Sequence, residues 1–446
     1  MNTPICDFVR DYLQRDPLRL HMPGHKGHGT VGCEARDITE ITGADVLYHA
    51  EGIIAESQAN AARLFGAAKT LYSTEGSSLS IRAMLHLTRL WATAQGKAPK
   101  IAAGRNAHKV FMTGCALLEL DVDWIYPADR SNLLACEITP AALEAYFAAT
   151  EEAPVAVYIT SPDYLGNLAD VAGLAAVCHR YGALLLVDNA HGAYLRFLQP
   201  SLHPLDLGAD LCCDSAHKTL PVLTGGGYLH IAANAPAFFA EEAEIAMALF
   251  ASTSPSYLTL QSLDAVNAYL AHTYPKLLES FLPEAEAVKQ RLQAKGFTLQ
   301  GQEPLKLTLA PKTFGYTGME LAALLEAHDV LCEFCDPDFL VLMLTPELGQ
   351  QGLQRLETIL TALPPRAAIL TAPPPLPAPA RACSLRQALF SPACTLPTAD
   401  CLGKVLAQAT VSCPPAIPPV VCGEVLDETA IACLTYYGID TCRVLI

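Results

Sequence analysis

The chain has 446 residues, of which 51% are hydrophobic and 17% are charged. This length allows a large buried core and predicts two or three domains. The formal net charge of −16, from 29 basic and 45 acidic residues, argues against binding to nucleic acids or anionic membranes and favours a cationic small molecule.

No targeting segment is expected. The N-terminal sequence MNTPICDFVRDYLQRD carries charges throughout and lacks the apolar core of a signal peptide. No continuous apolar run reaches the length of about 18 residues that a membrane-spanning helix needs. The sixteen cysteines are scattered through apolar segments, which indicates reduced, buried thiols. We therefore expect a cytoplasmic protein.

Strands and helices alternate between residues 50 and 235. Residues 77–94 place apolar side chains near one helical face, and residues 139–150 begin with a capping threonine followed by a proline. This alternation predicts an α/β fold with a mostly parallel sheet, whose functional residues gather at the carboxyl ends of the strands. The expected strands are residues 100–104, 122–126, 154–160, 183–188, 209–215 and 226–231.

A second, smaller α/β unit is expected further along the chain. Residues 256–296 have the pattern of linking helices, and two apolar segments, 304–310 and 339–345, flank the helical sequence GMELAALLEAH. The proline-rich residues 363–382 predict an extended, semi-rigid segment.

The stretch CCDSAHKTLPVLTGGG, residues 212–227, places Lys218 directly after His217, between an apolar run and a glycine triplet. Desolvation and neighbouring cations lower the pKa of a lysine and make its amine a nucleophile. We interpret Lys218 as such a nucleophile, and the alternative is an exposed loop lysine.

A lysine that binds pyridoxal phosphate needs an acidic group near the pyridine nitrogen of that cofactor. Asp188 ends the apolar sequence ALLLVD and is the candidate, with a helix cap as the alternative role. The small Ala190 leaves room for a flat ring. His191 either contacts the cofactor or caps a neighbouring loop.

The cofactor's phosphate needs hydrogen-bond donors at the start of a helix. Gly76, Ser77 and Ser78 precede an amphipathic helix, although serine-rich helix starts are also common as simple caps. Ser215 can add a hydroxyl group. His108 follows a predicted strand and either stacks on the cofactor ring or is an ordinary loop histidine.

The order of these motifs resembles the Orn/Lys/Arg decarboxylases of the aspartate-aminotransferase-like fold, in their short bacterial form. The resemblance covers nearly the whole chain and is strongest over residues 20–265. It rests on HMPGHKG (21–27), DITEITGADVLYHAEGII (37–54), STEGSS (73–78), DNAHGAY (188–194), SAHKTLPVLTGGGYLH (215–230) and STSPSYLTLQSLD (252–264).

The resemblance implies a fold of the pyridoxal-phosphate type I class with a mostly parallel seven-stranded sheet. It implies decarboxylation of lysine, arginine or ornithine to an amine, as in polyamine biosynthesis. Lys218 would hold the cofactor covalently, and Asp188 would pair with its pyridine nitrogen. Apart from the resemblance, Lys218 and His217 are the nearest candidates for the proton donor. The remaining expected cofactor contacts are Gly76, Ser77, Ser78, His108, His191, Ser215 and His217.

The resemblance also implies at least a homodimer with a shared active site, in which Thr253 reaches the phosphate in the partner subunit's site. The expected parts are an N-terminal segment that contributes to the active site (1–35), a cofactor-binding large domain (36–270), a small α/β domain (271–365), and a proline-rich linker with a C-terminal decarboxylase-type domain (366–446). No N-terminal regulator-like domain is expected.

The C-terminal sequence CPPAIPPVVCGE, residues 413–424, departs from the family pattern. Cys413, Ala416 and Cys422 stand where family members commonly carry tyrosine, glycine and proline. Near the other end of the chain, the histidines and cysteine of HMPGHKGHGTVGC allow a metal site as an alternative, but Pro23 and Gly24 prevent a regular helix there, and no metal is expected.

The substrate's distal cation needs an acidic partner. Glu333, Asp336 and Asp338 are the candidates, with a solvated acidic loop as the alternative. Other functions stay open at this point: a cysteine desulfurase, aminotransferase or aldolase-like reaction on the same cofactor, or, in a different class, a metal-dependent hydrolase or a non-catalytic regulatory relative.

Overall fold

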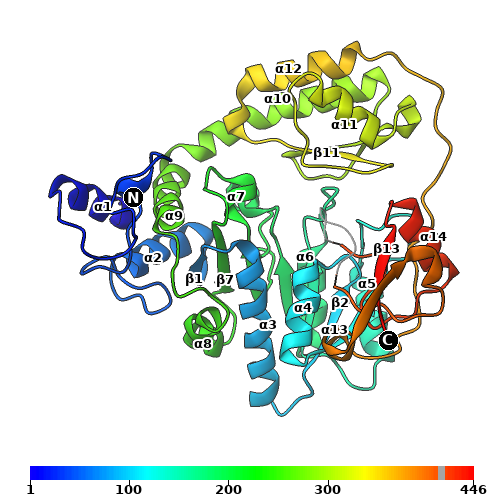
Figure 1. Ribbon diagram of the computed structural model, residues 1–446, viewed down its shortest axis with the longest axis horizontal. Coiled ribbons are helices and arrows are strands. Elements are labelled where there is room, and N and C mark those ends of the chain that lie inside the picture. The colour runs from blue at the N-terminus through cyan, green and yellow to red at the C-terminus, as the bar shows by residue number, and fades with distance from the viewer. Residues whose placement is uncertain (410–416) are drawn as a thin grey trace.

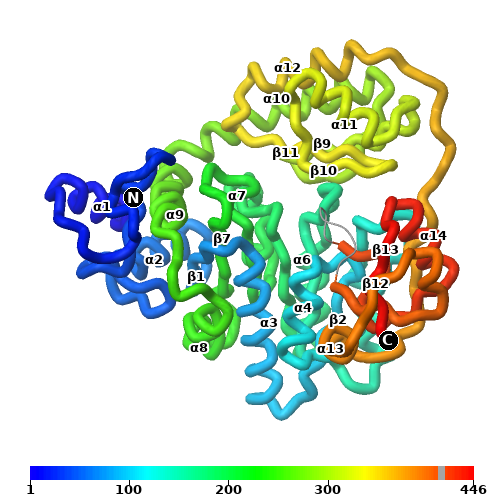
Figure 2. Tube along the Cα trace, viewed as in Figure 1, coloured from blue at the N-terminus to red at the C-terminus, as the bar shows by residue number. Residues whose placement is uncertain are grey.

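The computed structural model describes residues 1–409 and 417–446 (Figures 1 and 2). Its largest element is a seven-stranded sheet with the order β1-β7-β6-β5-β4-β2-β3. Neighbouring strands from β6 to β3 run parallel, whereas β7 runs antiparallel to both β1 and β6. The strands are β1 (Ala67–Ser73), β2 (Lys100–Gly104), β3 (Asp121–Ile125), β4 (Ala156–Thr160), β5 (Leu184–Asp188), β6 (Leu211–Asp214) and β7 (Gly227–Ala232).

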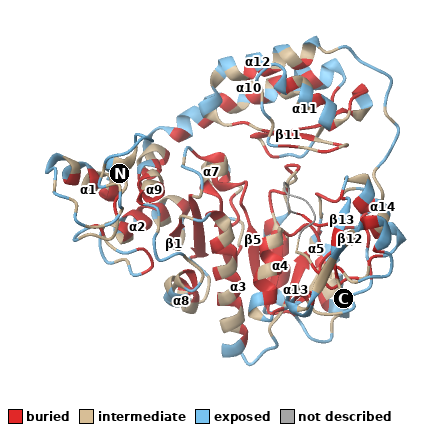
Figure 3. Cartoon of the chain, in the orientation of Figure 1, coloured by how far each residue is buried: buried red, intermediate tan, exposed pale blue. Residues whose placement is uncertain are grey.

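Helices cover both faces of this sheet. Along β5, Leu184 and Leu186 pack into the core that includes α3 and α4, whereas Leu185 and Val187 pack into the core that includes α5 and α6. This alternation is the two-residue period of a strand that is buried on both faces, and Figure 3 shows the strands as buried. The helices of this unit are α2 (Ile53–Phe65), α3 (Gly76–Ala94), α4 (Lys109–Leu118), α5 (Pro140–Ala149), α6 (Val171–Arg180), α7 (Ala216–Thr219), α8 (Ala237–Ala248) and α9 (Tyr257–His272).

A four-stranded antiparallel sheet with the order β10-β11-β9-β8 forms a second layer, drawn above the large sheet in Figure 1. Its strands are β8 (Thr298–Gln300), β9 (Lys306–Ala310), β10 (Phe334–Cys335) and β11 (Leu340–Met343). The helices of this layer are α10 (Tyr274–Lys295), α11 (Gly318–Glu326) and α12 (Gly349–Ala362). The expected small α/β unit is therefore present as a sheet with helices, while the proposed domain boundaries stay predictions.

The proline-rich segment is extended, because residues 364–380 contain no helix or strand. Figure 1 shows this segment running from α12 down to a C-terminal unit, whose two-stranded sheet pairs β12 (Ala393–Pro397) with β13 (Thr441–Leu445). The remaining helices are α1 (Pro4–Gln14), α13 (Leu385–Phe390) and α14 (Glu428–Tyr436).

Two sequence expectations bear on the molecule as a whole. In the described part of the chain, no helix combines the length and apolar character that crossing a bilayer requires. The described cysteines are free thiols, and many of them are buried in the cores.

Candidate active site

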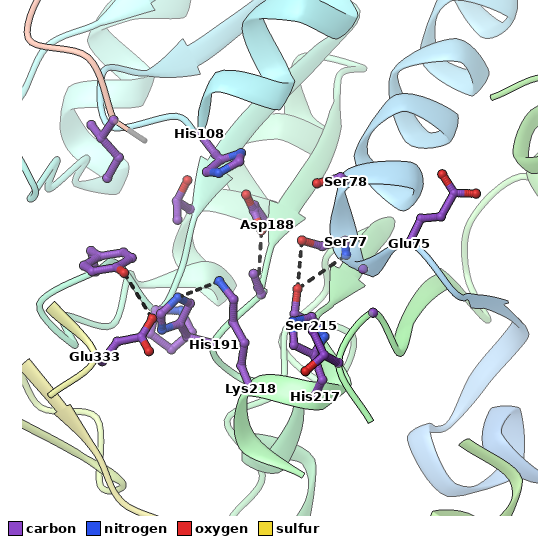
Figure 4. Close-up of a pocket in the computed structure, with 18 of the residues that line it drawn as sticks. Glu75, Ser77, Ser78, His108, Asp188, His191, Ser215, His217, Lys218 and Glu333 are labelled. Atoms are coloured by element: carbon purple, nitrogen blue, oxygen red, sulfur yellow. Dashed lines mark hydrogen bonds between the residues drawn. The ribbon is translucent and has the colours of Figure 1, made fainter. Parts of the chain in front are cut away.

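A pocket of about 400 Å³ opens at the carboxyl ends of the parallel strands (Figure 4). Its walls come from the starts of α3 and α7, from the ends of β4 and β5, and from Glu333 and Ile417 further along the chain. The predicted site residues that line it are Gly76, Ser77, Ser78, His108, Asp188, His191, Ser215, His217 and Lys218. Segments far apart in the sequence therefore meet in one cavity.

The glycine triplet explains how Lys218 reaches this cavity. Lys218 lies on the single turn of α7, directly after β6, and the chain then returns through residues 220–226 into β7. A Cβ atom on Gly225 would lie 2.7 Å from the Thr74 carbonyl oxygen, and one on Gly227 would lie 2.8 Å from the Asp214 carbonyl oxygen. Only glycine permits this close backbone approach, which holds the loop against the strand ends.

The Lys218 amine points into the pocket, where its Nζ lies 3.0 Å from His191 Nε2 (Figure 4). Burial lowers the pKa of Lys218 below its ordinary value. The carboxylates of Asp188 and Glu333 act to raise this pKa, and the Lys306 cation acts to lower it. A larger uncharged fraction makes this amine a better nucleophile than an exposed lysine.

Asp188 is the last residue of β5 and is 3% exposed. Its carboxylate accepts hydrogen bonds from the Tyr158 hydroxyl at 2.9 Å and from the Ala190 backbone N–H at 3.2 Å. No α-helix starts after it, because the chain next enters a short 3₁₀ turn at Ala193. The carboxylate lines the pocket instead of capping a helix.

The wall of the pocket that the start of α3 forms is rich in hydrogen-bond donors. Gly76, Ser77 and Ser78 are the first residues of the 19-residue helix α3, whose N-terminus favours an anion. The Ser215 hydroxyl donates to Ser77 Oγ at 2.9 Å, which ties the loop before Lys218 to the helix start. These groups form a cradle for a phosphate-sized anion.

Two histidines lie on either side of the cavity. His108 caps α4, where its Nδ1 accepts from the Val110 N–H at 3.2 Å, and burial lowers its pKa to about 4. Its ring is therefore uncharged near neutral pH. His217 Nδ1 lies 2.9 Å from the Gly226 carbonyl oxygen and so donates to it, and burial lowers the pKa of this ring as well.

The sequence model of the Orn/Lys/Arg decarboxylase major domain matches residues 3–304 of this chain. The chain belongs to the Orn/Lys/Arg decarboxylase family. It is thus an amino-acid decarboxylase of the pyridoxal-phosphate-dependent class, and the predicted fold class is confirmed.

Individual relatives agree with this assignment. An arginine decarboxylase of Bacillus subtilis is 28% identical over 467 residues, which cover 96% of this chain and 92% of the relative. The uncharacterized protein YaaO of the same organism is 31% identical over 368 residues, 77% of this chain and 74% of its own length. The constitutive lysine decarboxylase of E. coli superposes with a TM-score of 0.78 at 17% identity, covering 100% of this chain and 82% of that one, which shows a shared fold.

The pocket lining fits the cofactor of this family. It offers a nucleophilic amine, a buried carboxylate and a donor-rich helix start within one cavity of about 400 Å³. In addition, the buried Thr160 Oγ1 has no hydrogen-bond partner among the described residues, although it lies at the pocket wall. A buried hydroxyl without a partner is costly and points to a polar ligand.

Thr160 was not among the residues predicted from sequence, and neither were Glu75, Asn106, Tyr164, Thr224 and Ile417, which also line the pocket. Thr160 ends the predicted strand 154–160, so its position at a strand end was the available signal. Glu75, Thr224 and Ile417 lie inside the quoted motifs STEGSS, SAHKTLPVLTGGGYLH and CPPAIPPVVCGE, so their motifs were the available signal, whereas Asn106 and Tyr164 lie outside them.

Thr253 does not line this pocket and is exposed. The adjacent Ser252 donates its backbone N–H to Glu75 Oε1 at 2.9 Å, and Glu75 lines the pocket. No residue of segment 1–35 is among the described lining residues. The role of Thr253 in the partner subunit's site and the contribution of segment 1–35 to the active site therefore stay predictions.

The N-terminal histidines do not converge on a common point. His21 Nε2 lies 2.9 Å from the Tyr12 hydroxyl, and His25 Nε2 lies 3.2 Å from Asp37 Oδ2. Among the described residues, the one group with metal-ligand spacing is His203, Asp214 and His230, all fully buried. Burial acts to raise the pKa of Asp214, but the hydrogen-bonded histidines hold it below its ordinary value.

Of the three acidic residues proposed to bind the distal cation, one lines the pocket and two do not. Glu333 lines the pocket and accepts a hydrogen bond from the Tyr164 hydroxyl at 3.1 Å. Asp336 accepts from the backbone N–H groups of Asp338 and Phe339, and Asp338 pairs with Lys312. A solvated acidic loop is wrong for Asp336 and Asp338, because both are buried.

Of the three C-terminal residues that depart from the family pattern, the structure describes one. Cys413 and Ala416 lie outside the described residues, whereas Cys422 is buried in the main core. Glu424, two residues after Cys422, forms an ion pair with Arg105, and Ile417 contributes to the pocket wall.

Proposed function

We propose that this chain decarboxylates a basic amino acid, namely lysine, arginine or ornithine, with pyridoxal phosphate held covalently by Lys218. One observation carries the proposal: the pocket combines Lys218 and Asp188 with an acidic side chain, Glu333, that can bind a distal cation. Glu333 and the serines of α3 lie on opposite sides of Lys218 in Figure 4, so cofactor anchoring and substrate recognition are separated.

When bound, pyridoxal phosphate supplies an electron-withdrawing ring that accepts the electron pair left at Cα when carbon dioxide departs. The chain's residues prepare the site for this chemistry. Asp188 keeps a protonated pyridine nitrogen charged, since a carboxylate favours the cationic form of a neighbour. The α3 amides with Ser77, Ser78 and Ser215 would hold the phosphate, and the neutral His108 would contact the ring.

The substrate's distal amino or guanidinium group would pair with Glu333, which lines the pocket. Lys218 and His217 are the candidate proton donors to Cα, because both line the pocket. Lysine, arginine and ornithine are the candidate substrates because the family is described by these three amino acids, and arginine decarboxylases of Bacillus species are among the relatives.

A desulfurase reaction on the same cofactor is the less favoured alternative. It needs a cysteine thiol that can reach the substrate, and no cysteine is among the described residues that line the pocket. Cys213 contacts a pocket residue: it is 0% exposed and donates to Asp188 Oδ1 at 3.7 Å. Burial raises the pKa of this thiol well above its ordinary value, so it stays protonated.

We further propose that two copies assemble with shared active sites. The N-terminal segment exposes several large apolar side chains within a short stretch of sequence, and exposed apolar residues that gather in one patch mark an interaction surface. These residues are Leu18, Leu20, Met22 and Val31, of which Leu18 and Leu20 are each 84% exposed.

The function is tested with purified protein supplied with pyridoxal phosphate. Borohydride reduction followed by peptide mass spectrometry is expected to find the cofactor on the Lys218 peptide, and amine and carbon dioxide release from arginine, lysine and ornithine identifies the substrate. Lys218→Ala should lose both signals, whereas Lys97→Ala, an exposed lysine near the end of α3, should retain them. Cofactor on Lys218 without amine release from any of the three substrates would contradict the decarboxylase proposal.

A further inference from the structure

Lys306 is a buried cation that reaches the active site from the second sheet. It is the first residue of β9 and is 3% exposed. Its Nζ lies 2.8 Å from Glu303 Oε2, 3.1 Å from the Asp163 carbonyl oxygen and 3.1 Å from His191 Nδ1. The ion pair with Glu303 has side chains that are each 1% exposed, so both members depend on each other for charge compensation.

These contacts determine the direction of the hydrogen bond to His191. A lysine ammonium has three donor hydrogens and no acceptor, and Lys306 has three acceptors around it. His191 Nδ1 must therefore accept. A neutral imidazole that accepts at Nδ1 carries its proton on Nε2.

The proton on Nε2 points at the catalytic lysine. Lys218 Nζ lies 3.0 Å from His191 Nε2, and an N–H at this position can only donate. The partner that accepts is the lone pair of an uncharged Lys218 amine, because an ammonium has none. Figure 4 shows this contact as a dashed line between His191 and Lys218.

We propose that Lys306 is a positioning residue: its ammonium, held by Glu303, fixes His191 with the proton on Nε2 and thereby keeps the Lys218 amine as an uncharged hydrogen-bond acceptor before cofactor binding. The proposal rests on the proposed role of Lys218. It assigns a function to a charged residue of the second sheet that does not line the pocket, and it makes the contact between the two sheets part of the site's chemistry.

The charge state of Lys218 also depends on its other neighbours. Burial lowers the pKa of the His191 ring well below its ordinary value, and the Lys306 cation acts in the same direction, so His191 stays neutral. The titratable groups that face Lys218 from the surrounding elements are Asp188, Cys213, Lys306, Glu333, His108, His191 and His217. Asp188, Cys213 and Glu333 favour the ammonium, whereas Lys306 opposes it.

The first test reads the histidine directly in the unsubstituted chain, and a variant serves only to assign its signal. Cofactor-free protein labelled with ¹⁵N-histidine is examined by long-range ¹H–¹⁵N correlation, with His191→Gln to assign the ring. The protonated nitrogen of His191 is expected to be Nε2. A ring with its proton on Nδ1, or a doubly protonated ring near neutral pH, would overturn the proposal.

The second test measures the amine. Competitive labelling of cofactor-free protein with acetic anhydride across a pH series, quantified on the Lys218 peptide by mass spectrometry, gives the labelling midpoint of Lys218. Lys306→Met is expected to raise this midpoint by about one pH unit, the usual effect of one close charge. Lys306→Arg should restore the wild-type midpoint, because it retains the cation.

Lys312→Met is the matched control, since its ammonium pairs with Asp338, 2.5 Å away, and has no contact with His191 among its described bonds. It should leave the Lys218 midpoint unchanged. An unchanged Lys218 labelling midpoint in folded Lys306→Met would mean that Lys306 has only a structural role, and it would contradict the proposal. Neither measurement uses the cofactor, so a failure of the proposed function, seen as no cofactor on Lys218, stays distinguishable from a failure here.

Discussion

Arg105 and Glu424 form an ion pair across 319 residues of sequence, with Arg105 Nη2 3.1 Å from Glu424 Oε2. The guanidinium is fully buried and also donates to the carbonyl oxygens of Pro418 and Pro419. Arg105 directly follows β2 and lies three residues before His108, while Ile417 at the start of this C-terminal stretch lines the pocket. The pair therefore fixes the C-terminal unit against the candidate active site.

Removal of one partner should destabilise the fold strongly. Arg105→Met leaves the Glu424 carboxylate buried without its cation, which typically costs about 3–5 kcal/mol. The measurement is the urea midpoint of unfolding. Arg381→Met is the matched control, because its pair with Asp121 has side chains 43% and 53% exposed and should contribute no more than about 1 kcal/mol. Equal midpoints for the two variants would contradict a structural role of the buried pair.

Asp188→Asn should weaken the cofactor site without unfolding the chain. The amide can still accept from Tyr158, but it cannot stabilise a protonated pyridine nitrogen. Loss of a charge-assisted hydrogen bond is worth about 1.5–3 kcal/mol, or about 10- to 150-fold in cofactor affinity or turnover. Tyr158→Phe removes one donor to the carboxylate but leaves its charge, so its effect on cofactor affinity should be smaller than that of Asp188→Asn. Titration with pyridoxal phosphate and steady-state rates measure both, and a larger effect for Tyr158→Phe would contradict this ranking.

Glu333→Gln should affect substrate binding more than cofactor binding. Its carboxylate lines the pocket on the side away from α3, so its removal takes away attraction for the distal cation in ground state and transition state alike. We expect KM for the basic substrate to rise about 10- to 100-fold, with a smaller change in kcat. Glu326→Gln, an exposed acid in α11 of the same layer, is the control and should behave as wild type. A fall in kcat at unchanged KM would place Glu333 elsewhere in the reaction.

Much of this site was predictable from sequence, because parallel strands bring their carboxyl ends together. Asp188 at the end of one apolar segment and Ser215 and Lys218 after the next follow β5 and β6, which are neighbours in the sheet. The strand β1 was not predicted, because its sequence AAKTLYS lacks a clear alternation of apolar and polar residues. Its strand conformation depends on antiparallel pairing with β7, which is distant in sequence. The family resemblance and the fold class were confirmed.

The buried charges were the part that sequence could not predict. Lys306 looks like an ordinary polar residue at the start of a strand, and its burial depends on Glu303, Asp163 and His191, which come from three separate segments. In the same way, the sequence does not distinguish Glu333, Asp336 and Asp338 as partners for the substrate's distal cation, because all three are acids in one short stretch. Only the tertiary packing places Glu333 in the pocket wall and buries the other two.

Thr253 offers a test of site sharing between subunits. Thr253→Ala should lower cofactor affinity about 10- to 150-fold if its hydroxyl binds the phosphate. Chains that carry Thr253→Ala and chains that carry Lys218→Ala are co-expressed with different tags and purified as mixed assemblies. Activity at limiting cofactor should reappear in the mixture, because one site then has both intact residues. A mixture as inactive as its parents would show that Thr253 serves its own chain.

Asp163 should give the folded state a pH-dependent stability. Its side chain is almost fully buried, and it accepts from the backbone N–H groups of Leu165 and Asn167. Burial raises its pKa to about 6, although the Asn167 hydrogen bonds and Lys306 oppose the rise. The unfolded chain releases this proton near its ordinary pKa of about 3.9.

The folded state consequently binds more protons than the unfolded state between pH ~4 and pH ~6. The stability linked to Asp163 is fully present below this window and is lost as the pH rises through it, by about 3 kcal/mol in total. Asp163→Asn cannot titrate, so urea midpoints from pH 4 to pH 7 should show the difference between wild type and variant changing across that window. Asp129→Asn, an exposed carboxyl, should run parallel to wild type there. If the difference in urea midpoint between wild type and Asp163→Asn stayed constant from pH 4 to pH 7, the Lys306 cation would be keeping the Asp163 carboxyl ionised throughout. The charges of Asp163 and Lys306 would then be coupled.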